Sequence, residues 1–265
     1  AIKEVISDKN LDLDLKKIKF SKDIEILIAG CGTGQHAITT ASKYKNAEIF
    51  ALDLSFNSLA YAKRKAEELN CNNIKFIQGD LLDLRKLDKK FDIIESVGVL
   101  HHMADPLLGW ECLTDCLKKD ALMLIGLYSE KARENIVNIK EKINSLRIKT
   151  TKKNIINFRK DIFENNTTTW DSIKYSPDFY STSGVRDLLF HVQEHRFTIK
   201  KIRSHMNKLG LVFLGFEDTY VLNRFKKKYN QTNDLYDLDK WEDFEKNNSR
   251  IFSGMYQFWC MKNKS

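Results

Sequence analysis

The feature that most constrains this chain is a short apolar run that ends in closely spaced glycines. Residues 26–34 read Ile-Leu-Ile-Ala-Gly-Cys-Gly-Thr-Gly. A continuous apolar run is typical of a parallel strand covered by helices on both faces. Glycines after such a strand permit positive φ and let backbone N–H groups at a helix start approach a ligand closely. The turn therefore predicts a nucleotide-type site, although by itself it would also suit NAD, FAD or a phosphate.

Apolar runs alternate with amphipathic stretches throughout the first half of the chain. Five runs read as strands, at residues 24–29, 47–52, 74–77, 91–97 and 121–127. Three stretches between them read as helices, at residues 35–45, 55–69 and 106–119. This alternation predicts a parallel sheet with helices on both faces.

The rhythm is interrupted after residue 128 and returns near residue 198. Helical patterns are expected at residues 130–147, 154–164, 183–197 and 198–209, with irregular chain at 167–181 and strands at 211–216 and 255–261. We therefore predict an α/β, Rossmann-like fold with a seven-stranded sheet. It divides into a core (1–128), a helical insertion (129–197) and a return to the core (198–265) with a smaller insertion (218–253). The larger insertion is expected to serve as a lid, an acceptor surface or a homodimer contact.

Acids follow the second and third predicted strands. Asp53, with Leu54 beside it, can accept hydrogen bonds from both ribose hydroxyls of an adenosine. Its alternative role is to cap the next helix, a role that Ser55 can fill instead. Asp80 can accept a hydrogen bond from an adenine amino group, while the N–H of Leu81 donates to the ring.

This series resembles the class I S-adenosylmethionine-dependent methyltransferases. In that family the glycine turn, the two acids and a strand-four exit like residues 91–102, Phe-Asp-Ile-Ile-Glu-Ser-Val-Gly-Val-Leu-His-His, occur in this order. The resemblance covers residues 24–128 and 198–261, where a helix, Gly210, strand six and an antiparallel strand seven match the family. It implies a methyltransferase with S-adenosyl-L-methionine as cofactor and S-adenosyl-L-homocysteine as product.

The resemblance implies a set of cofactor-binding residues. They are Gly30, Cys31, Gly32, Gly34, Gln35, Asp53, Leu54, Asp80, Leu81 and Ser96. Most of the family carries an acid two residues before the first glycine, where this chain has Ile28. The methionine ammonium of the cofactor then needs other acceptors, for which the Gly30 carbonyl, Gln35 and His36 are candidates.

Five side chains are candidates for the reaction itself: His101, His102, Tyr128, His191 and His195. The histidines at 101 and 102 follow strand four, where class I enzymes bring the acceptor to the methyl group. An imidazole titrates near neutral pH and can orient or deprotonate a nucleophile. The alternative is that one histidine packs and the other is solvated. Tyr128 ends strand five, where open α/β sheets bind ligands, or else it covers the core.

Two short patterns suggest a metal, and neither has support elsewhere in the chain. His191 and His195, with Glu194, match an inverted zinc-peptidase motif if they lie on one helix. The pattern lies inside the insertion, so we favour a structural or acceptor-binding role. Cys112 and Cys116 lie four residues apart but lack a second pair, so we expect them to pack in the core. We expect no metal.

Charge and cysteine content bear on partners and compartment. The net charge is +8, but lysines alternate with acids, as in Lys-Arg-Lys-Ala-Glu-Glu at 63–68. The strand-four exit also lacks the Pro-Pro-aromatic segment with which base-amino methyltransferases stack a flipped base. Both features disfavour nucleic acid as a partner. Five scattered cysteines, no signal peptide and no long apolar stretch predict a cytoplasmic protein without membrane contact.

The acceptor stays open among several classes. Residues 127–133 and 179–198 are similar to bacterial methyltransferase domains linked to tetratricopeptide repeats and to rickettsial protein-lysine methyltransferases. This implies a nucleophilic N, O or S acceptor such as a protein lysine, and leaves room for an upstream partner domain. The Leu-His-His exit at 100–102 is equally common in enzymes that methylate small thiols, amines, hydroxyls or carboxylates. A non-catalytic binding module and a nicotinamide oxidoreductase are the remaining alternatives.

Overall fold

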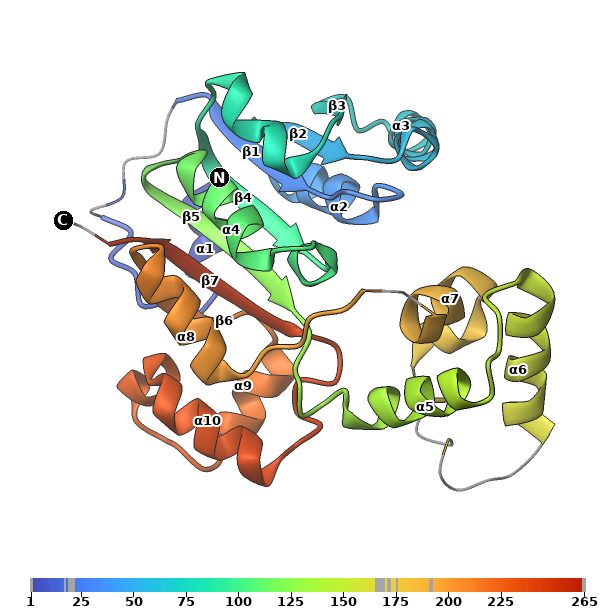
Figure 1. Ribbon diagram of the computed structural model, residues 1–265. Helices are drawn as coiled ribbons and strands as arrows, with labels where there is room; N and C mark the ends of the chain where they lie inside the picture. The colour runs from blue at the N-terminus through green and yellow to red at the C-terminus, as the bar shows by residue number, and fades with distance from the viewer. Residues whose placement is uncertain are drawn as a thin grey trace.

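The core is one seven-stranded sheet in the order β3-β2-β1-β4-β5-β7-β6 (Figure 1). The computed structural model describes residues 2–16, 18, 22–164, 170, 173–174, 176–190 and 193–263. The strands are β1 (Ile24–Ala29), β2 (Ala47–Asp53), β3 (Ile74–Gln78), β4 (Phe91–Val97), β5 (Leu117–Leu127), β6 (Leu211–Phe216) and β7 (Tyr256–Lys262). β7 runs antiparallel to both of its neighbours, β5 and β6, and the other strand pairs of the sheet are parallel. The predicted Rossmann-like sheet with an antiparallel seventh strand is confirmed.

Helices cover both faces of the sheet. One face carries α1 (Ile2–Ser7), α2 (Gln35–Lys43) and α3 (Phe56–Glu68). The other carries η1 (Leu81–Leu87), η2 (Leu100–His102), α4 (Pro106–Asp115), α8 (Ile199–Lys208), α9 (Thr219–Lys226), η5 (Thr232–Tyr236) and α10 (Leu238–Asn247). Two buried clusters follow from this division, because alternate residues of each strand face opposite layers.

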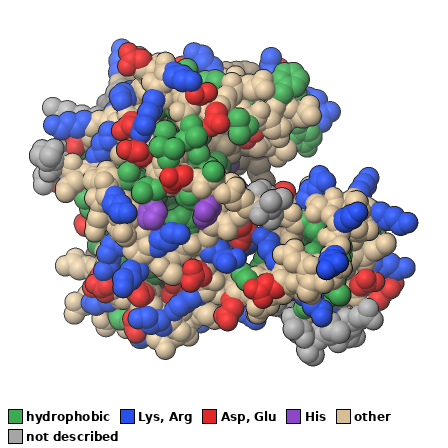
Figure 2. Space-filling model, viewed as in Figure 1, with side chains coloured by type: hydrophobic (Ala, Val, Ile, Leu, Met, Phe, Trp, Pro, Cys, Tyr) green, Lys and Arg blue, Asp and Glu red, His purple; other side chains and the backbone are tan. Residues whose placement is uncertain are grey.

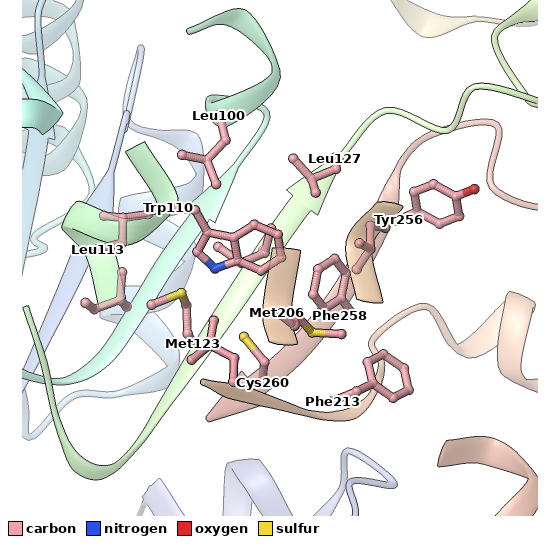
Figure 3. Close-up of a cluster of buried hydrophobic side chains, with 14 of the residues drawn as sticks. Leu100, Trp110, Leu113, Met123, Leu127, Met206, Phe213, Tyr256, Phe258 and Cys260 are labelled. Atoms are coloured by element: carbon pink, nitrogen blue, oxygen red, sulfur yellow. The ribbon is translucent and has the colours of Figure 1, made fainter. Parts of the chain in front are cut away.

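The larger cluster lies under α4 and α8 and is rich in aromatic rings. Trp110 of α4 packs 5.8 Å from Phe258 of β7, measured between ring centroids. Figure 3 shows Leu100, Met206 and Cys260 around the same space. Cys112 and Cys116 are also buried in this cluster, which confirms the prediction that they pack in the core.

The insertion after β5 is a helical lobe with its own core. Its helices are α5 (Glu134–Ser145), α6 (Lys152–Glu164), η4 (Pro177–Tyr180) and α7 (Thr182–Phe190). Ile139, Phe158 and Phe179 belong to a buried cluster formed within the lobe. Figures 1 and 2 show the lobe as a separate mass beside the sheet, joined to it by two chain segments. The predicted helical insertion is present, and its role as a lid, acceptor surface or dimer contact stays a prediction.

Two predicted helices in the insertion are longer than the observed ones. The helix expected at 183–197 ends at Phe190, and residues 193–196 are not helical. The cause is a set of backbone bonds to the core, including one from the Phe197 N–H to the Tyr128 carbonyl (2.9 Å). The helix expected at 130–147 begins at Glu134, because Ser129 Oγ accepts the Ala132 N–H in a preceding turn. Tertiary bonds override the local pattern in both places.

The connection between β6 and β7 holds helices that the sequence analysis did not identify. Asp218 accepts backbone N–H groups at the start of α9, and Asp237 does the same for α10. Aspartate is a common N-cap, so these two residues are the signals that could have revealed the helices. None of the helices in the described part of the chain has the length and apolar character needed to span a bilayer.

Candidate functional site

The glycine turn leaves β1 at the carboxyl edge of the sheet and leads into α2. Gly30, Gly32 and Gly34 have φ values of 79°, 53° and 87°. A Cβ on Gly30 would lie 2.3 Å from a Val99 side-chain carbon, and one on Gly34 would lie 2.6 Å from the Ala62 Cβ. Only glycine combines these backbone angles with such close contacts. Packing therefore holds the turn open at the start of the helix.

Cys31, inside the turn, is buried and chemically inert. Burial, together with the negative charge of Asp53, raises the pKa of its thiol to about 12. A thiol with such a pKa stays protonated at neutral pH and is a poor nucleophile. Its Sγ is 3.8 Å from the Gly32 carbonyl oxygen, so the side chain packs against the turn that contains it.

Asp53 ends β2 beside the glycine turn. Its carboxylate accepts the Gly32 N–H at 2.7 Å and the Ser55 N–H at 2.8 Å, on different oxygens. The N-cap of α3 is Ser55, whose Oγ accepts the Ser58 N–H at 3.2 Å. The carboxylate is thus oriented by the turn, and each oxygen keeps a lone pair for a ligand hydroxyl. Leu54 is 67% exposed beside it and offers apolar surface.

The third strand brings a further acid to the same edge. Asp80 caps η1, and its Oδ1 accepts the Leu82 N–H at 2.9 Å. Leu81 is buried beneath it. The Gly79 N–H donates to the Asp53 carbonyl at 3.1 Å, which ties this loop to the end of β2. The loops after β1, β2 and β3 therefore meet where open α/β sheets bind nucleotides.

A carboxylate that the sequence analysis missed lies beside Ile28. In the parallel pairing of β1 and β4, Ile28 is the register partner of Glu95. The Glu95 Oε2 accepts the Thr40 hydroxyl at 2.8 Å and lies 2.7 Å from His36 Nε2. Its neighbour Ser96 is fully buried, and within the described residues its Oγ lacks a hydrogen-bond partner. The sequence feature that could have identified Glu95 is an acid inside an otherwise apolar strand.

The exits of β4 and β5 bring three of the predicted catalytic residues together. The ring of His101 stacks on Tyr128 with 3.7 Å between centroids. The ring of His102 meets His101 edge-on at 4.4 Å. His101 is fully buried, whereas His102 is half-buried. Burial raises the pKa of Tyr128, so its phenol is neutral at neutral pH.

The segment that leaves the lobe, residues 193–197, adds a fourth predicted residue. The His195 N–H donates to the His101 carbonyl at 2.7 Å. The Gln193 carbonyl oxygen lies 3.1 Å from His102 Nδ1. His191 lies outside the described residues. Residues 193–196 are not helical, so the helix that was expected to carry both histidines does not extend to His195.

Glu194, which would be the base of the zinc-peptidase pattern, is committed to ion pairs. It lies 2.9 Å from two Arg133 nitrogens and 2.7 Å from Lys140 Nζ. Burial raises the pKa of Glu194, but Arg133 and Lys140 outweigh burial and leave it below its usual value. The guanidinium also lies 3.6 Å above the Tyr128 ring, so Arg133 links these ion pairs to the end of β5. The described residues contain no cluster of three or more potential metal ligands.

A cavity of about 480 Å³ adjoins this cluster, between the sheet edge and the lobe. Tyr128 and Met255 line it from the core, and Leu188 lines it from the lobe. Charged groups reach it from both sides, Arg250 from the core and Asp178 from the lobe, and Arg133, which directly precedes α5, lines it as well. Met255, which lines the cavity, lies beside Gly98 at the β4 exit. A Cβ on Gly98 would be 3.6 Å from the Met255 methyl carbon. The space has the size of a small-molecule or side-chain pocket.

Comparisons with known proteins agree with this geometry. A family model described as a methyltransferase domain matches residues 20–179. An uncharacterised Synechococcus protein is 30% identical over 201 residues, 73% of this chain and 48% of that protein. The (S)-coclaurine N-methyltransferase of Papaver somniferum is 26% identical over 115 residues, 43% of this chain and 32% of the enzyme. The chain spans less than half the length of both.

A solved structure shares the fold over nearly the whole chain. PKMT2 from Rickettsia typhi, in complex with AdoHcy, superposes with a TM-score of 0.64 and 18% sequence identity. The match covers 97% of this chain and 51% of that one. At this identity the likeness concerns the fold, including the position of the helical lobe within it.

Proposed function

The chain belongs to the class I S-adenosylmethionine-dependent methyltransferases, and we propose that its acceptor is an amine nitrogen that enters the cavity beside Tyr128. The cofactor is S-adenosyl-L-methionine and the product is S-adenosyl-L-homocysteine. The observation that carries the proposal is the cavity itself. It joins the β4 and β5 exits to the lobe, and its wall includes a residue predicted as catalytic from the sequence.

The cofactor contacts are proposed for the loops after β1, β2 and β3. Asp53 is placed to accept the ribose hydroxyls, and the exposed Leu54 to cover one face of the adenine. Asp80 and Leu81 are proposed for the adenine edge, and Gln35 for the methionine end. The fit rests on the positive-φ glycines, which carry no side chains and so let a ligand approach the backbone of the turn closely.

His102 is proposed to orient the acceptor or take its proton. Its Nδ1 faces a carbonyl oxygen at 3.1 Å, and a carbonyl can only accept, so we assign a proton to Nδ1. In the neutral form of the ring, the lone pair is then on Nε2. The bound cofactor supplies a methyl group already activated by a positive sulfonium. The chain must therefore hold the acceptor in line, deprotonate it and keep water out.

A protein lysine is the acceptor that we propose first. Its support is the resemblance of residues 127–133 and 179–198 to protein-lysine methyltransferases. A small-molecule amine is the second candidate, favoured by a cavity volume that matches small-molecule pockets and by the plant N-methyltransferase relative. On the face in Figure 2, Lys and Arg alternate with Asp and Glu, which disfavours nucleic acid.

The acceptor class is tested by incubating the protein with methyl-labelled S-adenosylmethionine and a fractionated lysate. We expect label in protein, located on lysine by mass spectrometry. Label in small amines would favour the second candidate, and label in nucleic acid would overturn both. Cofactor binding without transfer to any fraction would indicate a non-catalytic binding module.

The contribution of His102 is tested in the same assay. We expect His102→Ala to slow transfer by about 100-fold, the lower range for loss of a general base, without weakening cofactor binding. His205→Ala is the matched control, because His205 lies on α8 and its ring packs against Trp110 and Phe197 of the core. Equal effects of the two substitutions would contradict a catalytic role for His102.

A further inference from the structure

We propose that Glu95, with His36 and Thr40, forms an anchoring site for a ligand ammonium, and that the methionine ammonium of the cofactor occupies it. Glu95 lies on β4, whereas His36 and Thr40 lie on α2, which begins directly after the glycine turn. The inference depends on the identity of the cofactor and not on the acceptor proposed above.

Glu95 is a buried charge inside an otherwise apolar layer. Its side chain is 5% exposed, and its register partners across the sheet are Ile28 of β1 and Leu124 of β5. Burying a carboxylate in such surroundings costs several kcal/mol unless hydrogen bonds or an opposite charge compensate it. A partner that compensates this free-energy cost is therefore expected near Glu95.

The partners of Glu95 within the described residues compensate it only in part. Thr40 Oγ1 donates at 2.8 Å and His36 Nε2 lies at 2.7 Å, and both contacts are to Oε2. Within the described part of the chain, the Oε1 atom of Glu95 accepts no hydrogen bond. No Lys or Arg of that part forms an ion pair with Glu95. A carboxylate has about four acceptor positions. One oxygen is thus left to bind a cation.

The cavity next to Glu95 is small, and lysines as well as carboxylates line it. It holds about 200 Å³ and is lined by Glu95, Tyr44 and Glu217, among others. Glu217 is neutralised separately, because Lys9 pairs with it and the Trp259 Nε1–H donates to it at 2.6 Å. Burial, together with the charges of Glu95 and Glu217, raises the pKa of Tyr44. The space suits an amino-acid head group and is too small for a nucleoside.

The position of the site points to the methionine end of the cofactor. His36 lies in the first turn of α2, and Ile28 is two residues before Gly30. A helix start favours the methionine carboxylate, because its N–H groups and dipole attract anions. The neighbouring ammonium needs a carboxylate, and position 28 supplies none. Adjacent strands lie about 4.8 Å apart, so Glu95 brings an acid to the same region from the next strand.

The test compares two ligands by calorimetry: S-adenosylhomocysteine, which carries the ammonium, and 5′-methylthioadenosine, which lacks the amino-acid end. We expect Glu95→Gln to weaken binding of S-adenosylhomocysteine by about tenfold or more, the range for a hydrogen bond to a charged group. Binding of 5′-methylthioadenosine should change by less than about twofold. Glu217→Gln is the matched control, a carboxylate of the same cavity that is already paired, and should spare both ligands.

A second variant places a carboxylate on β1 in place of the one removed from β4. Ile28→Asp in the Glu95→Gln background should restore part of the lost affinity, with folding checked by circular dichroism. Unchanged S-adenosylhomocysteine binding in Glu95→Gln would overturn the proposal, as would an equal loss for both ligands, which indicates a structural role. None of these binding results depends on the acceptor, so they fail or succeed separately from the labelling experiment.

Discussion

At the scale of single residues, Asp53 serves the fold and the ligand site together. One oxygen holds the Gly32 N–H of the turn and the other holds the Ser55 N–H at the start of α3. The same carboxylate is therefore fixed in direction before any ligand arrives. Such preorganisation lowers the cost of ordering a binding group.

The ribose role of Asp53 leads to a binding prediction. We expect Asp53→Ala to weaken S-adenosylmethionine binding by at least about tenfold, or about 1.4 kcal/mol, measured by calorimetry. Ser55→Ala is the control: it removes the α3 cap and should cost stability of about 1 kcal/mol while leaving affinity nearly unchanged. Unchanged affinity in Asp53→Ala would contradict the ribose assignment.

Gly34 leads to a stability prediction at the same scale. Alanine there would adopt a φ of 87° and place its Cβ 2.6 Å from that of Ala62. We expect Gly34→Ala to lower the free energy of unfolding by about 2–4 kcal/mol, from backbone strain and overpacking together. Gly32→Ala has a similar φ but nothing within 4 Å, so it should cost only about 1–2 kcal/mol. Urea unfolding of the ligand-free protein measures both, and equal losses would argue against the packing component.

At the scale of elements, the two segments that join the lobe to the sheet are clamped together. Ser129 and Phe197 form a parallel bridge. Glu194 of the exit segment forms ion pairs with Arg133, which directly precedes α5, and with Lys140 of α5. The exit segment also bonds to the main chain of His101. The orientation of the lobe is thereby coupled to the histidines beside the cavity.

The ion pairs of Glu194 predict a pH dependence of stability. Its pKa in the folded protein is below the usual 4.5, so its contribution is complete above that value and is lost as the pH falls through the folded-state pKa. We expect Glu194→Gln to cost about 3 kcal/mol at neutral pH, because Arg133 and Lys140 lose their partner. The difference from the unsubstituted protein should shrink on acidification.

Urea unfolding between neutral pH and the acid range below 4.5 measures this difference. Glu141→Gln is the control, since it removes an exposed carboxylate from α5, the helix that carries Lys140. It should change the free energy of unfolding by less than about 0.5 kcal/mol. A pH-independent gap between Glu194→Gln and the unsubstituted protein would show that the charge of Glu194 is not the stabilising factor.

At the scale of the whole molecule, the lobe and the sheet have separate cores. Ile139, Phe158 and Phe179 pack within the lobe, while the loops proposed to hold the cofactor follow β1, β2 and β3 of the sheet. Figure 1 shows that only the two joining segments connect these parts. Cofactor binding and acceptor selection are therefore assigned to different parts of the chain.

Removing the lobe tests this division of labour. We expect replacement of residues 130–196 by a short glycine-serine linker to leave S-adenosylhomocysteine binding within about threefold, since the proposed cofactor residues are retained. Transfer to the acceptor should fall to background, because the cavity loses one wall. Unchanged acceptor range together with an unchanged oligomeric state, measured by light scattering, would contradict the lid, acceptor and dimer roles of the insertion.

The order of the strands could be predicted because each strand is identified by a local pattern. Apolar runs such as residues 24–29 and 91–97 identify buried parallel strands without knowledge of their neighbours. The glycine turn and Asp53 could be predicted for a similar reason, since their chemistry is read within a few residues. Helix ends in the lobe were predicted less well, because bonds from residues 193–197 to the core end the helix early.

The sequence alone therefore established the fold class, the glycine turn and the positions of the strand exits, since each is encoded in a short window of residues. The pairing of Glu95 with His36, 59 residues away, depended on the register of β1 and β4 and on the packing of α2 above them. The engagement of Glu194 by Arg133, 61 residues away, depended on the path of the exit segment. Contacts at such separations arise only when the sheet brings distant segments together, so the tertiary structure decides them.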